Sequence, residues 1–317
     1  MSAFLQLAPM QGLTEYIFMN AHQQIFGGFS EMMTPYLSAN GKSPIKIQTL
    51  QKQFDLFANE ISIVPQLLSN DADGFVYYAN LLYDLGYKKV NWNLGCPFPT
   101  VTKKIRGAGL LQYPEKIASL LDEICSQLKP KLSVKIRLGM ESNEDILTLI
   151  PILNKYPIHE LIIHPRTAIQ KYEGLVDKQT FGEIYSQFKM PVIYNGDILK
   201  KEDMESLNQR FINLKGFMIG RGAFINPFLP NQINGIDYSN TEKVELFKKF
   251  YFNIHNEYME TTIYTSSFLG KMKEMWSYFS QAFENGSSIH ANLKTVNDIP
   301  SFEDAVLKIF STGKLLI

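Results

Sequence analysis

Residues 89–93 (KVNWN) and residues 132–136 (LSVKI) are two short strand-like runs separated by a segment with the pattern of a helix. In that segment apolar residues recur at spacings of three and four, at Ile117, Leu120, Leu121, Ile124 and Leu128. This spacing is typical of one face of an amphipathic helix. A strand, a helix and a second strand in this order predict a parallel βα unit.

The same alternation extends in both directions along the chain. Six further strand-like runs are Phe4–Ala8, Phe29–Met33, Ile61–Leu67, Glu160–His164, Pro191–Asn195 and Gly216–Ile219. Eight runs alternating with helical stretches predict an α/β fold, the (β/α)8 TIM barrel, and 317 residues leave room for a small appendage. Pro65 lacks the N–H of an interior strand, so we expect a bulge in the third run.

The composition changes after the eighth run. The turn pairs Asn226-Pro227 and Asn234-Gly235 predict a linker over Asn226–Asn240. Beyond it the apolar residues keep a helical spacing, and no strand-like alternation returns. We therefore expect a barrel domain over residues 1–230 and a small all-helical domain over residues 241–317.

Charge and cysteine content exclude several classes of protein. Lysines and arginines number 31 and acidic residues 31, so the chain is not a basic nucleic-acid binder overall, although a local basic patch remains compatible with this balance. The two cysteines, Cys96 and Cys125, form neither a disulfide framework nor a zinc-ligand pattern, and we expect no metal. Residues 1–9 do not resemble a signal peptide, and no run of about 18 apolar residues occurs, so we expect a cytoplasmic protein without a membrane span.

Polar residues follow the predicted strands, where barrel enzymes carry their chemistry. They are Gln66, Asn93, Lys135, His164 and Asn195, and the second run carries Glu31. The amides of Gln66 and Asn93 can pair with the polar edge of a heterocycle. Lys135 can place a positive charge beside the N1–C2 carbonyl region of a flavin.

The last two strands end in residues that suit a phosphate group. In Asn195-Gly196 and Gly220-Arg221, glycine lets backbone N–H groups approach a phosphate, and arginine adds charge. Taken singly, Lys135 could be a salt-bridged structural residue, His164 a hydrogen-bonded rim residue, and the glycines turn residues. Their joint position at successive strand ends favours a site for a planar, phosphorylated cofactor.

The stretch Asn93–Pro97 (NLGCP) resembles the active-site signature of the tRNA-dihydrouridine synthase family. Further stretches that resemble the family's motifs in order are Ala8–Met10, Val64–Leu67, Arg106–Leu111, Val134–Gly139, His164–Thr167, Asn195–Ile198 and Met218–Ala223. Lys271–Tyr278 resembles the lysine-tryptophan-tyrosine helix of the bacterial C-type enzymes, which act on position 16 of the tRNA D-loop. The chain departs from the family pattern at Pro165, usually glycine, and at Phe98-Pro99, usually serine and lysine.

The resemblance implies FMN as cofactor, NADPH as reductant and reduction of a tRNA uridine to 5,6-dihydrouridine. The cofactor-binding residues it implies are Pro9, Met10, Gln11, Gln66, Asn93, Lys135, His164, Asn195, Gly196, Asp197, Gly220 and Arg221. Hydride passes from flavin N5 to C6 of the uracil, and Cys96 is the candidate acid that protonates C5. A thiol of ordinary pKa, about 8.5, is protonated at neutral pH, as a proton donor must be.

Contacts with tRNA are expected from Lys103, Lys104, Arg106, Arg137, Arg166, Lys271 and Lys273. Residues 230–317 contain eight lysines, no arginine and ten acidic residues, an excess of two negative charges. Contacts in this region must therefore come from a few placed residues or from aromatic side chains.

Two other functions agree with parts of the sequence. An FMN-dependent barrel oxidoreductase acting on a small molecule, like dihydroorotate dehydrogenase, would share the lysine strand and the phosphate site. The NLGCP stretch and the helical tail argue against it. A non-catalytic RNA-binding protein on a degenerate barrel is disfavoured by the joint presence of Cys96, Lys135 and Gly220-Arg221. We expect the protein to act as a monomer.

Overall fold

The computed structural model describes residues 3–41 and 61–317, and its barrel is built from one parallel sheet. The strands are β1 (Leu5–Leu7), β2 (Glu31–Met33), β3 (Leu37–Ser38), β4 (Ser62–Val64), β5 (Gln66–Leu68), β6 (Lys89–Leu94), β7 (Lys131–Gly139), β8 (Glu160–Thr167), β9 (Val192–Asn195) and β10 (Gly216–Ile219). They follow the order β3-β5-β6-β7-β8-β9-β10-β1-β2-β4. All eight predicted runs contain strand, which confirms the predicted barrel.

The barrel closes at Pro65, the residue between β4 and β5. β4 pairs with β2, and β5 pairs with β6, so one continuous stretch joins both ends of the sheet. Pro65 has no N–H to donate, but its carbonyl accepts a hydrogen bond from the Asn91 N–H at 2.9 Å. In place of the expected bulge, the third run breaks at Pro65 into two strands that pair with different neighbours.

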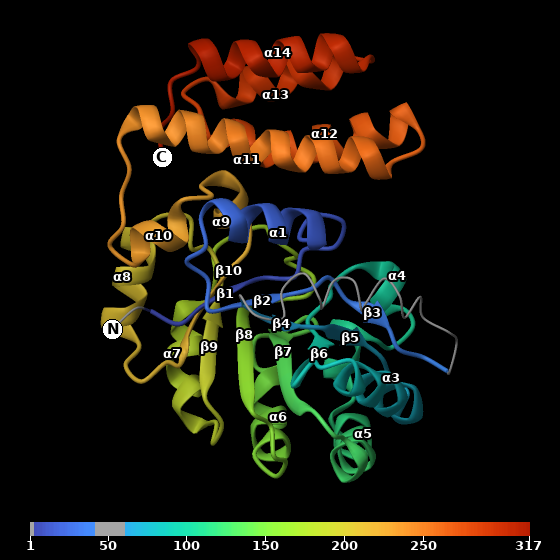
Figure 1. The fold of residues 1–317 in the computed structure, drawn as a ribbon. Helices are drawn as coiled ribbons and strands as arrows, with labels where there is room; N and C mark the ends of the chain where they lie inside the picture. Colours follow the sequence, from blue (N-terminus) through green and yellow to red (C-terminus); the bar gives the residue numbers. More distant parts are fainter. Residues whose placement is uncertain (1–2, 42–60) are drawn as a thin grey trace.

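Helices cover the outside of the barrel (Figure 1). They are α1 (Tyr16–Ile25), α3 (Ala72–Asp84), α4 (Pro99–Thr102), α5 (Pro114–Gln127), α6 (Asp145–Leu153), α7 (Lys178–Ile184), α8 (Lys201–Arg210), α9 (Arg221–Ile225) and α10 (Leu229–Ile233), with short 3-10 turns at η1 (Gly107–Gln112) and η2 (Tyr185–Gln187). In α5 the predicted apolar stripe is buried at Ile117, Leu120, Leu121 and Ile124. Burial of such a stripe is what attaches each helix to the sheet.

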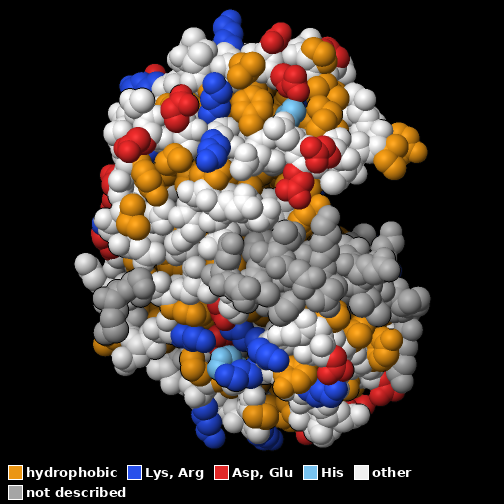
Figure 2. Space-filling model, viewed as in Figure 1, with side chains coloured by type: hydrophobic (Ala, Val, Ile, Leu, Met, Phe, Trp, Pro, Cys, Tyr) orange, Lys and Arg blue, Asp and Glu red, His pale blue; other side chains and the backbone are white. Residues whose placement is uncertain are grey.

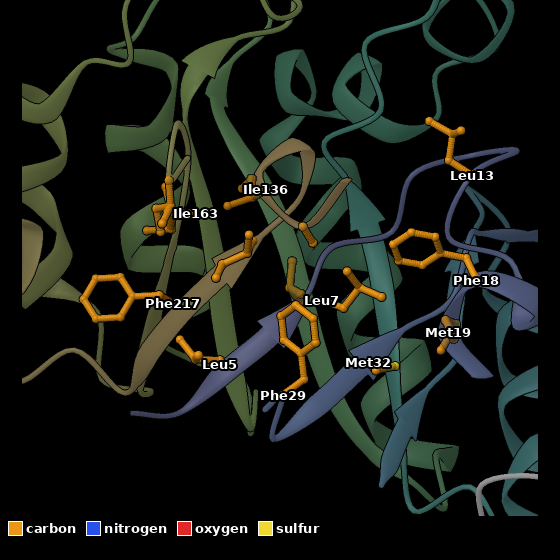
Figure 3. Close-up of a cluster of buried hydrophobic side chains, with 14 of the residues drawn as sticks. Leu5, Leu7, Leu13, Phe18, Met19, Phe29, Met32, Ile136, Ile163 and Phe217 are labelled. Atoms are coloured by element: carbon orange, nitrogen blue, oxygen red, sulfur yellow. The ribbon is translucent and has the colours of Figure 1, made fainter. Parts of the chain in front are cut away.

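Side chains of the strands alternate between the helices and the barrel interior, as the two-residue period of a strand requires. Leu5 and Leu7 belong to the outer core, where Figure 3 shows Leu5 on the side of Phe217 and Leu7 on the side of Phe18 of α1. Gln6, between them, points inward and hydrogen-bonds Glu160 of β8 at 3.1 Å. The same alternation turns the polar residues of β6 and β7 into the barrel.

The interior has an ionic layer at the amino ends of the strands. Lys89 lies 2.6 Å from Glu31 and 2.7 Å from Glu160, and Lys215 also pairs with Glu160. Glu31 is the first residue of β2 and lies in this layer, so its expected place at a carboxyl end is wrong. An apolar layer follows, made of Ala8, Met33, Val64, Ile162, Ile193 and Met218.

The chain beyond the barrel is helical, as expected. It consists of α11 (Asn240–Thr261), α12 (Thr265–Phe279), η3 (Ser280–Ala282), α13 (Gly286–Thr295) and α14 (Ile299–Thr312), stacked beside α1 and α9 (Figure 1). Ser239 and Glu242 form a capping box at the start of α11. Phe18 of α1 stacks on Phe224 of α9 at 4.0 Å and meets Phe250 of α11 at 5.5 Å. These rings join the helices to the barrel.

The predicted linker is only partly a linker. It contains α10, and Asn231 donates to the Phe26 carbonyl at 2.8 Å from a buried position. Asn234 accepts from the Ala3 N–H at 3.2 Å. These amides fasten the segment to the barrel, although asparagine in sequence reads equally well as a turn residue.

Across residues 3–41 and 61–317, no helix combines the length and the apolar character needed to cross a membrane.

Candidate active site

A cavity of about 910 Å³ opens at the carboxyl ends of the barrel strands. Every residue assigned to the cofactor from the sequence lines it: Pro9, Met10, Gln11, Gln66, Asn93, Lys135, His164, Asn195, Gly196, Asp197, Gly220 and Arg221. Cys96 and Arg137 line it as well.

Strand register places the central residues side by side. Asn93 of β6 is the partner of Lys135 of β7, and Arg137 of β7 is the partner of His164 of β8. All four point inward, because side chains at every second position of a strand face the same side and these positions share the inward side of their strands. The register therefore builds one wall of the cavity.

Gln66 and Asn93 use much of their hydrogen-bonding capacity on the protein itself. Gln66 donates to Asn91 at 2.8 Å and accepts from the Asn93 side-chain amide at 2.7 Å. The Asn93 carbonyl accepts from the backbone N–H groups of Gly95 and Cys96, at 2.9 and 2.8 Å. Asn93 thus shapes the turn that carries the cysteine, and one amide hydrogen of Asn93 is left for a ligand.

Cys96 lies in the cavity wall and is 7% exposed. Burial raises the pKa of its thiol, while a hydrogen bond from the Phe98 backbone, one from Tyr36 and the charges of Arg137 and Lys135 act in the opposite direction. The net direction is upward, so the thiol is protonated at neutral pH. Gly107 has φ of +55°, and a Cβ there would lie 2.8 Å from the Cys96 carbonyl, so glycine is required for this close approach.

Lys135 is a cation without an anionic partner among the described residues. No hydrogen bond or ion pair joins its ammonium group to residues 3–41 or 61–317. Burial lowers the pKa of Lys135 to about 7, and the charge of Arg137 acts in the same direction. An electron-rich ring edge placed beside it would restore its charge, which is what the N1–C2 region of a reduced flavin offers.

An ionic cluster around Asp197 lies next to His164. Arg166 donates to the Asp197 carboxylate at 2.6 and 3.0 Å, and Arg221 donates to it at 2.6 Å. Arg166 also donates to Nε2 of His164 at 3.1 Å. Because arginine can only donate, His164 Nε2 accepts and its proton is on Nδ1. Burial and the surrounding cations lower the pKa of His164 well below its usual value, so the ring is neutral.

Glycines and an arginine lie at the end of the cavity expected for a phosphate. Gly220 precedes α9, whose first residue is Arg221, and Gly196 follows β9. A Cβ at Gly196 would lie 2.8 Å from Val176, so this glycine is also required by packing. Asn195 donates to the Met218 carbonyl at 2.8 Å and thereby joins β9 to β10. With Lys135 at the ring end, this donor set fits a flavin carrying a phosphate.

Four of the residues assigned to tRNA are placed otherwise. Arg166 is paired with Asp197, and its side chain is 2% exposed. Arg137 is a cavity residue, donating to the carbonyls of Gly95 and Thr167 at 2.9 and 2.8 Å. Lys271 donates to the Gly12 carbonyl, and Lys273 donates to the Lys294 carbonyl at 3.0 Å. Their hydrogen bonds serve the packing of α12 against the barrel and α13.

Lys103 and Lys104 are exposed just beyond α4, the short helix that follows the cysteine turn. Arg106 is half-buried and donates to Asn70 at 3.3 Å and to Ser38 at 3.5 Å. Of the residues assigned to tRNA, only the two lysines combine exposure with a place beside the cavity.

Two aromatic residues of the cavity were missed in the sequence. Tyr36 follows β2, lines the cavity and packs against Cys96. Tyr172 follows β8, and its ring lies between Arg137 and Arg221, with each guanidinium carbon 5.5 Å from the ring centre. Both lie a few residues after a strand end, a position that is a usable signal in the sequence.

Cys125 is not among the residues that line the cavity. It is half-buried in α5, and burial raises the pKa of its thiol to about 11. Both cysteines are free. In the described part of the chain no three His, Cys, Asp or Glu side chains gather in a group able to hold a metal ion.

Sequence comparisons identify the family. The model of the dihydrouridine synthase family matches residues 6–311. The tRNA-dihydrouridine synthase B of Pasteurella multocida is 30% identical over 70% of this chain and 66% of its own length. The tRNA-dihydrouridine(16) synthase of Neisseria meningitidis serogroup B is 28% identical over 92% of this chain and 90% of its own.

Comparison with solved structures supports the fold. The old yellow enzyme homologue from Zymomonas mobilis matches with a TM-score of 0.54 and 12% identity, over 73% of this chain and 87% of its own. Morphinone reductase matches with a TM-score of 0.54 and 10% identity, over 73% of this chain and 86% of its own. Likeness at this identity concerns the barrel architecture alone. On the match over residues 6–311, the chain belongs to the dihydrouridine synthase family.

Proposed function

We propose that this chain is an FMN-dependent tRNA-dihydrouridine synthase that reduces a uridine of the tRNA D-loop to 5,6-dihydrouridine, with NADPH as the reductant. Residues 1–230 form the catalytic barrel in this proposal, and residues 241–317 form a helical domain that contacts tRNA. Family membership supports the reaction class.

The observation that carries the proposal is the presence of a protonated thiol and an unpaired lysine in the wall of one cavity. Cys96 lies in the turn after β6 and Lys135 in the neighbouring strand β7, and their charges influence each other's pKa. Reduction of a carbon–carbon double bond by a flavin requires an acid, here the Cys96 thiol, and a positive charge beside the electron-rich reduced ring, here Lys135.

The residues that would hold FMN divide by the part of the cofactor they suit. Lys135 and the free amide hydrogen of Asn93 suit the polar edge of the ring. Gly196, Gly220 and Arg221 suit the phosphate, with Asp197 holding Arg221 in place at 2.6 Å. When bound, the flavin supplies the hydride that reaches C6 of the uracil.

Cys96 supplies the proton. Because burial raises the pKa of its thiol, the S–H group is intact at neutral pH and can protonate C5 of the uracil. Arg137, which keeps its charge at neutral pH with a pKa of about 10, and Lys135 then lie near the sulfur when it becomes a thiolate. Both cations stabilise that negative charge.

The target uracil must leave its stack in the folded RNA, at a cost of a few kcal/mol. Lys103 and Lys104, exposed beside the cysteine turn, would offset part of this cost by contacting phosphates. On the face shown in Figure 2, acidic and basic side chains alternate over the helical region. Its contacts with tRNA therefore depend on shape and on a few residues.

We further propose that the modified position is 16. Several relatives carry this position in their names, among them the Neisseria meningitidis enzyme and the tRNA-dihydrouridine(16) synthase of Vibrio parahaemolyticus, which is 29% identical over 73% of this chain and 72% of its own. The resemblance of Lys271–Tyr278 to the position-16 enzymes agrees with this assignment.

The test is mass spectrometry of D-loop fragments after unmodified tRNA has been incubated with the protein and NADPH. The proposal predicts that one uridine gains two hydrogen atoms, and fragmentation locates it. Reduction at another D-loop uridine would contradict the assignment of position 16, while the proposed reaction would still hold. Absence of any reduced uridine, with a flavin-loaded protein that oxidises NADPH, would favour a small-molecule substrate.

A further inference from the structure

Tyr36 lies in the turn between β2 and β3 and lines the cavity beside Cys96. Its half-buried ring packs against a small cluster of Leu68, Cys96 and Val101. This contact places a phenol next to the group that the proposed reaction uses as its acid.

Tyr36 packs against the Cys96 side chain, and the pKa of each group depends on the other. Because a phenolic O–H is a better donor than S–H, a hydrogen bond between them has the hydroxyl as donor and Sγ as acceptor. Burial and the neighbouring Cys96 raise the pKa of Tyr36, so the hydroxyl keeps its proton at neutral pH. The S–H group is thereby free to point elsewhere, and the open side is the cavity.

We propose that Tyr36 is a positioning residue for Cys96, whose hydroxyl fixes the thiol with its proton toward the substrate and stabilises the thiolate left after proton transfer. This inference rests on the proposed function for its place in a reaction.

The proton-transfer step balances without any other group of the protein. The S–H bond of Cys96 breaks, and a C–H bond forms at C5 of the uracil, using the electron pair that hydride addition at C6 places there. The reduced flavin is the source of the hydride. The sulfur keeps the S–H electron pair as a thiolate, which accepts the Tyr36 hydrogen bond until water returns a proton after product release.

The contribution of Tyr36 to the thiol pKa can be measured apart from the contributions of the other groups around Cys96. β7 supplies the charges of Lys135 and Arg137, and the turn after Cys96 supplies the Phe98 backbone N–H. β5 and α4 contribute apolar Leu68 and Val101. Tyr36 is thus the neutral side-chain donor to the thiol among the described residues, and its hydroxyl can be removed without changing any charge.

The test compares Tyr36→Phe with a control, Tyr113→Phe, in the flavin-loaded protein. Tyr113 is 45% exposed, precedes α5 and is absent from the cavity wall. The first measurement is the pH dependence of Cys96 alkylation by iodoacetamide, read by peptide mass spectrometry, which separates Cys96 from Cys125. Removing a donor to the thiolate raises the thiol pKa, so we expect the Tyr36→Phe midpoint about one pH unit above wild type.

The second measurement is a single turnover, in which the reduced protein is mixed with unmodified tRNA. We expect uridine reduction about tenfold slower in Tyr36→Phe than in wild type or Tyr113→Phe. Reduction of the flavin by NADPH should be unchanged, because Tyr36 acts on the thiol.

An alkylation profile equal to wild type would overturn the inference, and so would equal slowing of both half-reactions. If wild type reduces no uridine, the proposed function fails, while the alkylation profile still decides whether Tyr36 controls the thiol.

Discussion

Removal of the Asp197 carboxylate should destabilise the protein, because Arg166 would lose its anionic partner in the interior. The Arg166 side chain is 2% exposed and donates to both oxygens of Asp197, whose own side chain is 26% exposed. Breaking a buried ion pair costs about 3–5 kcal/mol, and the partial exposure of the carboxylate favours the lower end. We expect Asp197→Asn to lower the free energy of unfolding by about 3 kcal/mol.

Asp197→Ala should cost more than Asp197→Asn, because Asp197 has φ of +45°. Asparagine tolerates this left-handed conformation, whereas alanine adds about 1 kcal/mol of strain. Urea unfolding followed by circular dichroism measures both changes. Glu205→Gln is the control, since Glu205 is 49% exposed in an i,i+4 pair with Lys201 and should change stability by less than about 0.5 kcal/mol. An Asp197→Asn variant as stable as this control would refute the reasoning.

Three further predictions concern lysines. Lys135→Met should release flavin more readily, yet stabilise the flavin-free protein. The stabilisation should be greatest below the folded pKa of about 7, where the buried charge is fully present, and should fall as pH rises toward the ordinary pKa of 10.5. Flavin retention measures the first effect, and urea unfolding across pH measures the second. Lys271→Met should lower the free energy of unfolding by about 1.5–3 kcal/mol, because it removes a charged hydrogen bond to the Gly12 carbonyl of the barrel. Lys273→Met should lower it by less, because the hydrogen bond of Lys273 goes to the Lys294 carbonyl and not to the barrel. Thermal unfolding compares the two variants. Replacing Lys103 and Lys104 together by glutamine should weaken tRNA binding and reduce its salt dependence, with NADPH oxidation unchanged; equal salt slopes in a filter-binding titration would contradict this.

The barrel could be predicted because its determinants are local. Strand-like runs at regular intervals are visible in one pass, and the break at Pro65 follows from a missing N–H. The short strand β3, Leu37–Ser38, was missed because two residues carry no pattern. Glu31 was misplaced because the run begins at Phe29 whereas the strand begins at Glu31, which puts the carboxylate at the amino end.

The residues that line the cavity could be predicted because they follow strands and alternate inward. The surroundings of the residues assigned to tRNA could be predicted less well, because charge in a sequence does not reveal its partner. Arg166 meets Asp197 across 31 positions, and Lys271 meets Gly12 across 259. Such pairs form only when the fold brings distant segments together. In the sequence alone, an arginine on the cavity rim cannot be distinguished from an arginine in a buried ion pair.

The most direct test of the account is anaerobic reoxidation of the reduced flavin by unmodified tRNA, followed by flavin absorbance in wild type and in Cys96→Ala. We predict that tRNA restores the oxidised absorbance in wild type, and that Cys96→Ala keeps its flavin but loses most of this reaction. Full activity in Cys96→Ala would remove the thiol from the acid's role. A wild-type flavin that tRNA leaves reduced would contradict the assignment of this cavity to uridine reduction.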